Sequence, residues 1–319
     1  MIAFSYCDLH NQVMDIQLRL NEAKKTKSLY LDHTNIHQLP ELPYDLKELN
    51  CRNSTITQLT RLPNTLEALN CSGSRIRSLP DLPSSLLYLD CSVVTFSYLP
   101  LLPPNLRSLY MSFAYLTELP MLPDSLEIFC CSNCKLTQLP PLPTGLRELT
   151  CSYNSLKELP SLPPSLTVLN CSFNPLVQLP DLPKGLLELS CYNCDLLVLP
   201  ALPTSLRSLS CVLNLLSSLP PLPCSLELLN CTMNPWNDAF SARISECLTL
   251  QEKIDAIGHY HSELVRIRKQ LKDFLHHVSH LCVHTIANDD ILVRIGSFLS
   301  GSEGTLPFQY CRLLDALPE

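Results

Sequence analysis

Glycine is scarce in this sequence, with 7 residues among 319, whereas proline and cysteine number 27 and 17. So little glycine excludes collagen and flexible low-complexity polymers, and it leaves no glycine-rich loop to cradle a phosphate. Basic residues are also outnumbered, because 23 Lys and Arg stand against 30 Asp and Glu and give a formal net charge of −7. Without a broad cationic surface, the chain is not expected to bind nucleic acid.

Long apolar runs are missing as well. Proline or a charged residue interrupts every stretch before it reaches the roughly 18 apolar residues that a membrane span needs, so we expect no stable membrane span. Residues 1–8 lack the basic start, the apolar run and the small-residue cleavage site of a secretory signal peptide. The cysteines are therefore expected to be reduced thiols rather than a disulfide framework.

A repeat of 20 residues dominates what is present, and its unit reads L-x-x-L-x-C-x-x-N-x-L-x-x-L-P-x-L-P-x-x, as in residues 146–165. This is the leucine-rich-repeat pattern with cysteine in the third apolar slot. Methionine takes that slot once, at Met111. Otherwise the slot holds Cys51, Cys71, Cys91, Cys131, Cys151, Cys171, Cys191, Cys211 and Cys231.

Each repeat predicts a short strand followed by an extended return. The alternation around Leu49 and Cys51 points apolar side chains inward and the residues between them outward. The L-P-x-L-P segment removes two backbone donors and cannot be helical. We therefore predict a leucine-rich-repeat solenoid of the α/β repeat class, with eleven parallel strands centred near residues 29 to 229 on the concave face and a polyproline-like convex side.

The asparagine slot of the unit predicts a buried amide that satisfies backbone groups of the turn. The first half of the array instead carries Val94 and Ala114, which provide no amide, so we expect those turns to be held less tightly. The difference between the two halves is either tolerated sequence drift or the mark of a functional hinge in the first half. Asparagine occupies the slot at Asn154, Asn174, Asn214 and Asn234, cysteine at Cys134 and Cys194, and serine at Ser54 and Ser74.

The L-x-x-L-P-x-L-P-x-x-L unit resembles the repeats of the IpaH and YopM class of bacterial effectors, and the resemblance covers residues 28–236. It implies a virulence-associated protein-binding module that leaves the bacterial cytoplasm through a type III, type IV or related secretion system. It would then act in the host cell cytosol on a host protein. In that class a short helical segment precedes the repeats, and residues 8–24 are the candidate for it.

These observations predict three regions: an N-terminal helical cap (1–27), the solenoid (28–236) and a C-terminal α-helical region (237–319). In the last region the hydrophobic period becomes helical, and Thr249 with Glu252 forms a capping-box signal for a helix over about 250–282. Such helices would cap the last repeat. Alternatively, they serve as a second partner contact or in self-association.

The IpaH branch adds a large ubiquitin-ligase domain with a C-x-D nucleophile motif. Only 83 residues (319 minus 236) follow Trp236, and no Cys stands two residues before an Asp. We therefore expect a non-enzymatic scaffold without catalytic residues. The alternative is a ligase-like enzyme that selects its substrate with the repeats and reacts through Cys247, Cys282 or Cys311.

Histidines 276, 280 and 284 have helical spacing that could share a metal with Cys282. No further ligand stands at a matching spacing, so we expect neither a metal site nor a cofactor.

Aromatic residues at outward positions of the repeats are the candidate partner-binding residues. Phe113 shares a phase with Tyr153 and Phe173, and the latter two lie in adjacent turns, which predicts that they stand side by side. Aromatic side chains are enriched in protein-binding hot spots. The alternative is neutral drift wherever solvent is tolerated. The candidate set is Tyr88, Tyr110, Phe113, Tyr153, Phe173 and Tyr192.

Overall fold

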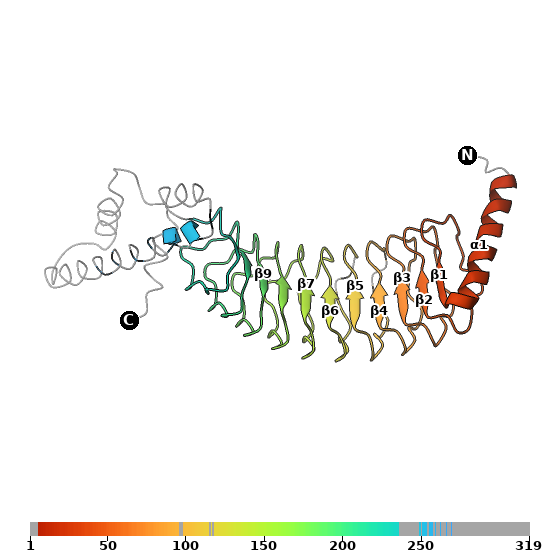
Figure 1. The fold of residues 1–319 in the computed structure, drawn as a ribbon, viewed down its shortest axis with the longest axis horizontal. Coiled ribbons are helices and arrows are strands. Elements are labelled where there is room, and N and C mark those ends of the chain that lie inside the picture. Colours follow the sequence, from red (N-terminus) through yellow and green to blue (C-terminus); the bar gives the residue numbers. More distant parts are fainter. Residues whose placement is uncertain are drawn as a thin grey trace, which may run out of the picture. The chain divides into compact units, whose positions relative to one another are not determined.

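The computed structural model describes residues 6–95, 98–114, 116, 118–235, 249, 251–253 and 255–257, together with residues 259, 262, 266 and 269. Its main feature is one sheet of 11 parallel strands, which follow one another in sequence order (Figure 1). Each strand has three residues. The strands are β1 (Ser28–Tyr30), β2 (Glu48–Asn50), β3 (Ala68–Asn70), β4 (Tyr88–Asp90), β5 (Ser108–Tyr110), β6 (Ile128–Cys130), β7 (Glu148–Thr150), β8 (Val168–Asn170), β9 (Glu188–Ser190), β10 (Ser208–Ser210) and β11 (Leu228–Asn230).

The register of the sheet follows the 20-residue repeat without a slip. Leu149 of β7 pairs with Leu169 of β8, which in turn pairs with Leu189 of β9. In every strand the middle residue is buried, and the residues on either side of it are less buried. This arrangement confirms the predicted solenoid and its eleven strands.

Leucine and cysteine columns fill the interior. Leu46, Leu49 and Cys51 have no exposed surface, and their equivalents in the following repeats repeat this burial, with Phe129 replacing a leucine once. Burying one leucine contributes roughly 1.5 to 3 kcal/mol, so the stability is a sum of many neighbouring contacts. Burial raises the pKa of the Cys51 and Cys151 thiols to about 12, which keeps them protonated at neutral pH.

The L-P-x-L-P segments form neither helix nor strand, as their prolines predict. A tight turn follows each segment and leads into the next strand. In these turns the backbone N–H of a leucine donates to the carbonyl of the proline three residues earlier, as in the bond of 3.1 Å from Leu46 to Pro43. The turn recurs with the same bond from Leu66 to Pro63 and on to Leu226 and Pro223.

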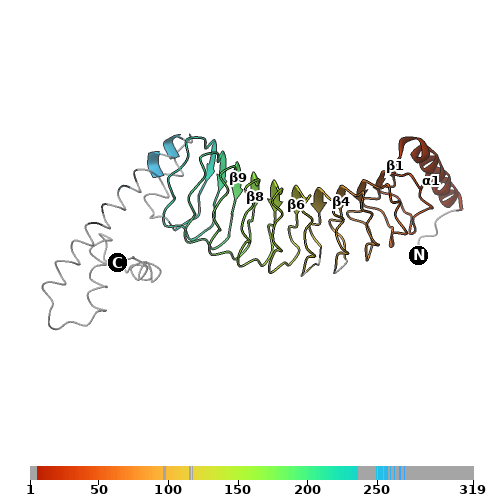
Figure 2. The same ribbon diagram turned by 90° about the horizontal axis from the view of Figure 1, so that it is seen from below.

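Helix α1 (Tyr6–Thr26) precedes the sheet and lies beside β1 in both views (Figures 1 and 2), which confirms the predicted helical segment. Ala23 is fully buried at this junction. The Arg19 guanidinium donates to the carbonyl of Tyr30 at 2.9 Å, so the helix covers the first edge of the sheet.

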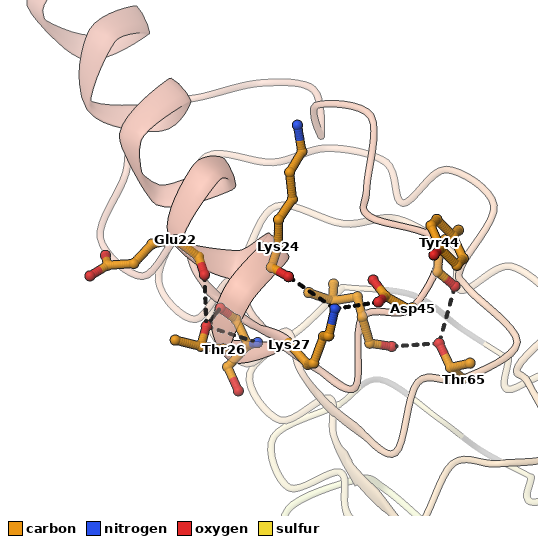
Figure 3. A network of polar contacts seen from close by, with 9 residues as sticks. Glu22, Lys24, Thr26, Lys27, Tyr44, Asp45 and Thr65 are labelled. Atoms are coloured by element: carbon orange, nitrogen blue, oxygen red, sulfur yellow. Dashed lines mark hydrogen bonds and ion pairs between the residues drawn. The ribbon is translucent and has the colours of Figure 1, made fainter.

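Lys27 ends α1 in a left-handed conformation with φ of 64°, and its N–H donates to the Ala23 carbonyl at 2.8 Å. Its ammonium donates to the Lys24 carbonyl at 2.9 Å and also pairs with the Asp45 carboxylate (Figure 3). That bond from Lys27 lowers the pKa of Asp45. The network therefore fastens the end of α1 to the turn before β2.

Capping geometry at Thr249 agrees with the predicted start of a C-terminal helix. The Thr249 N–H donates to the Glu252 carboxylate at 2.9 Å, and the Glu252 N–H donates to the Thr249 hydroxyl at 3.2 Å. The described residues from 251 to 269 are helical, and the remainder of the predicted helix to residue 282 lies outside the described part. The chain divides into compact units of residues 1–257 and 258–319. The predicted boundary at residue 236 stays a prediction.

The asparagine slot behaves as predicted. The Asn174 amide donates to the carbonyls of Cys151 and Cys171, both at 2.9 Å, and more weakly to that of Ser172 at 3.3 Å. Its carbonyl oxygen accepts the Leu156 N–H at 3.1 Å. One buried side chain thus satisfies backbone groups of two consecutive repeats, and Asn154, Asn214 and Asn234 form equivalent bonds.

Candidate protein-binding site

The residue at one fixed repeat position, in the turn after each strand, adopts a left-handed backbone conformation. In Tyr153 and Phe173, φ is 54° and 57°, and both N–H groups donate to a carbonyl of the next repeat, at 2.9 and 2.7 Å. The stacking of the repeats therefore imposes this conformation. The eleven positions are His33, Asn53, Gly73, Val93, Phe113, Asn133, Tyr153, Phe173, Asn193, Leu213 and Met233, with φ between 52° and 66°.

Asparagine and glycine are the residues that tolerate such a conformation, and four of these positions carry them. A bulky side chain there costs about 1 to 2 kcal/mol, and a β-branched one such as Val93 is still less suited. We call the six positions that nevertheless carry a large apolar side chain the rim column: Val93, Phe113, Tyr153, Phe173, Leu213 and Met233.

At five of the six positions burial does not repay that conformational cost, and Phe173 is the one that is partly buried. The exposed fractions are 57% for Val93, 56% for Phe113, 53% for Tyr153 and 69% for Met233. Large apolar side chains that are both exposed and conformationally unfavourable need another reason to be present, and strained positions often mark functional sites.

The predicted neighbourhood of Tyr153 and Phe173 is confirmed. Their rings stack with centroids 4.0 Å apart and planes inclined by 14°, and Tyr192 lies against Phe173 at 4.7 Å and 56°. We call these three residues the rim stack. Such contacts contribute about 0.5 to 1.5 kcal/mol each and hold the rings in fixed positions.

A second aromatic pair lies on the exposed face of the sheet. The rings of Tyr88 in β4 and Tyr110 in β5 are 5.5 Å apart and tilted by 41°. Burial, and next the nearby Asp90 carboxylate, raise the pKa of Tyr88 to about 12, so its phenol stays neutral. Five of the six candidate residues therefore form two groups of contacting rings. Phe113 belongs to the rim column, and the described residues show no ring contact for it.

Val93, Leu213 and Met233 occupy the same repeat position as Tyr153 but were not among the predicted partner-binding residues. The 20-residue phase could have found them, but only aromatic residues were sought. It could not have shown that the position is left-handed, because φ depends on how the repeats stack.

The catalytic alternative receives no support from the described residues. Cys247, Cys282 and Cys311 lie outside the described part, as do histidines 276, 280 and 284. Within that part no group of three metal-ligating side chains lies together. Among the ladder thiols, burial raises the pKa of Cys71, Cys131 and Cys191 well above the ordinary value, which makes them poor nucleophiles. None of the helices that the structure describes has the length and apolar character to cross a membrane.

Comparison with solved structures places the repeat region among bacterial leucine-rich-repeat proteins. YopM from Yersinia enterocolitica WA-314 is 38% identical over 66% of this chain and 47% of its own, with a TM-score of 0.65, so the match spans about half of that protein. The functional domain of InlJ from Listeria monocytogenes, which includes a cysteine ladder, is 24% identical over 66% of this chain and 54% of its own, with a TM-score of 0.56.

No protein-family model matches the chain, and no curated protein matches it in sequence. The similarity to YopM nevertheless covers 66% of this chain at 38% identity. InlJ supports the same solenoid fold. The repeat region of this chain is therefore confirmed to resemble the leucine-rich-repeat scaffold of the YopM class of bacterial effectors.

Proposed function

We propose that this chain is a secreted bacterial effector whose repeats bind a host protein, and that the rim stack is central to this contact. The rim column carries the proposal, since it exposes large apolar side chains at positions whose backbone favours asparagine or glycine. The similarity to YopM supports the effector assignment. The rim stack supplies the rigid aromatic anchors that are typical of binding hot spots.

Hydrogen bonds that hold the turns of the rim stack favour a binding role for its aromatic side chains over neutral drift. Asn154 and Asn174 lie next in sequence to Tyr153 and Phe173, and their amides fix the turns that carry the two rings. A ring held in place loses little conformational entropy when a partner binds. The turns of the rim stack therefore combine a partly exposed aromatic surface with a preformed geometry.

The test is capture of host proteins from a cell lysate with the full chain as bait, read by mass spectrometry. The Tyr153→Asn/Phe173→Asn double variant places at both positions the residue found at Asn133 and Asn193. We expect this variant to fold normally. The amount of specific partner that it captures should be lower than that captured by the parent chain by about tenfold or more.

A control variant removes exposed apolar side chains elsewhere, and its two residues are more exposed than Tyr153 and Phe173. Leu101 and Met121 lie in the segments between strands and are 87% and 71% exposed. The Leu101→Asn/Met121→Asn variant should capture the partner as the parent chain does. Equal capture by the parent and the rim-stack variant would contradict the proposal, as would equal loss in both double variants.

A further inference from the structure

The tyrosine pair on the sheet face has a carboxylate beside it. Asp90 lies two residues after Tyr88 in β4 and is the register partner of Tyr110 in β5, so it stands about 5 Å along the sheet from Tyr110 at the backbone. Tyr88, Asp90 and Tyr110 are all partly exposed. Two phenol rings and one carboxylate thus face solvent together.

The fold does not require a negative charge at Asp90. Its carboxylate accepts the Ser92 N–H at 3.0 Å, and the uncharged amides of Asn70 and Asn170 accept the equivalent N–H at 3.1 and 3.2 Å. Asparagine would therefore make the same turn without a charge. A carboxylate thus stands at a position where the neutral residue is structurally equivalent.

Negative charge on the outward face of the strands extends beyond Asp90. On strands β3 to β11 the outward positions carry three charged residues, Asp90, Glu148 and Glu188, all acidic. Burial first, and then Cys130, Glu148 and Asp90, raise the pKa of Tyr110. For Tyr88 the Arg52 guanidinium, which follows β2, acts in the opposite direction but less strongly than Asp90.

The arginines and lysines that come just before the strands are paired with other carboxylates, whereas Arg52, which follows β2, has no ion pair within the described part. Lys47 pairs with Glu67 at 2.7 Å. Arg107 and Arg147 both pair with Glu127, at 3.5 and 3.8 Å. The outward carboxylates of β4 to β9 have no such ion pair within the described part.

We propose that the sheet face from β4 to β7 binds a basic segment of the partner protein, with an arginine or lysine side chain held against Tyr88 and Tyr110 beside Asp90. Charge complementarity and the attraction of cations to aromatic rings both favour this occupant. The proposal rests on the proposed protein-binding function, and it assigns a chemistry to a part of the surface that the rim stack does not include.

The test measures binding of a labelled arginine–glycine repeat peptide to the full chain by fluorescence anisotropy. A glutamine–glycine peptide of the same length is the neutral control. We expect the arginine peptide to bind, with affinity falling as salt rises from about 50 to about 300 mM, and the neutral peptide not to bind. Equal binding of both peptides, or of neither, would overturn the proposal.

Two matched carboxylate variants locate the site. Asp90→Asn keeps the acceptor for Ser92 and should weaken arginine-peptide binding about threefold to tenfold. Asp181→Asn removes the same charge from an exposed residue in a segment between strands and should leave binding unchanged. An equal affinity in both variants would contradict the assignment to Asp90.

The rim-stack variant separates this inference from the proposed function. Tyr153→Asn/Phe173→Asn should lose the host partner yet bind the arginine peptide as the parent does, because it leaves Tyr88, Asp90 and Tyr110 unchanged. If Asp90→Asn has no effect while the rim-stack variant still loses its partner, the cation site is wrong and the proposed function stands.

Discussion

The two halves of the solenoid share one fold but hold their turns by different means. In the second half, Asn154 and Asn174 each donate to three backbone carbonyls. In the first half, the hydroxyls of Ser54 and Ser74 donate to one carbonyl each, at 2.7 and 2.6 Å, and Val94 offers no polar group. The comparison teaches that apolar columns suffice to set the repeat geometry, whereas the asparagines strengthen the turns that carry the rim stack.

The largest effect expected from a single substitution comes from removing a buried amide in the second half. Asn174→Ala would leave carbonyls of Cys151 and Cys171 and the N–H of Leu156 without their partner, so we expect a loss of about 3 kcal/mol in the free energy of unfolding. Urea denaturation measures this loss. Ser74→Ala breaks one bond and should cost about 1 kcal/mol. Equal losses in the two variants would remove the contrast between the halves.

Placing the missing amide in the first half should increase the free energy of unfolding. Val94 is 1% exposed and occupies the slot that Asn174 fills in a later repeat. Val94→Asn is expected to raise the free energy of unfolding by about 1 kcal/mol, because carbonyls of two repeats acquire a donor. Urea denaturation of the variant and the parent chain under the same conditions measures this increase. A loss of 1 kcal/mol or more would show that the first half cannot use an amide there.

The smallest effect concerns the junction between α1 and the first repeats. Because Lys27 lowers the pKa of Asp45, this carboxylate stabilises the fold above its ordinary pKa of about 4, and the contribution is lost as the pH falls through the lower folded value. Asp45→Asn should therefore have a lower Tm than the parent at pH 7. The difference should narrow below about pH 4, and a difference independent of pH would refute this assignment.

Most of the fold could be predicted because the 20-residue period fixes which side chains face inward, and a shift of one residue would expose Leu49 and its equivalents. The juxtaposition of Tyr153 and Phe173 followed from the same period. The pairing of Tyr88 with Tyr110 did not, since these residues differ in phase by two positions and meet diagonally across β4 and β5.

The backbone conformation of the rim column was beyond the reach of the sequence. Valine, phenylalanine and methionine give no signal for a left-handed turn, and the asparagines at 53, 133 and 193 are too few to define one without the stacked repeats. Consequently, the sequence indicated which aromatics are exposed but not that their exposure carries a conformational cost.

The central claim is that the rim column is kept for binding at the expense of stability. The most direct test is urea denaturation of a variant in which Val93, Phe113, Leu213 and Met233 are all replaced by asparagine, because none of these four belongs to the rim stack. The account predicts a gain of about 1 kcal/mol per position in the free energy of unfolding. An unchanged or lower free energy would contradict it, since the apolar side chains would then fit their positions without cost.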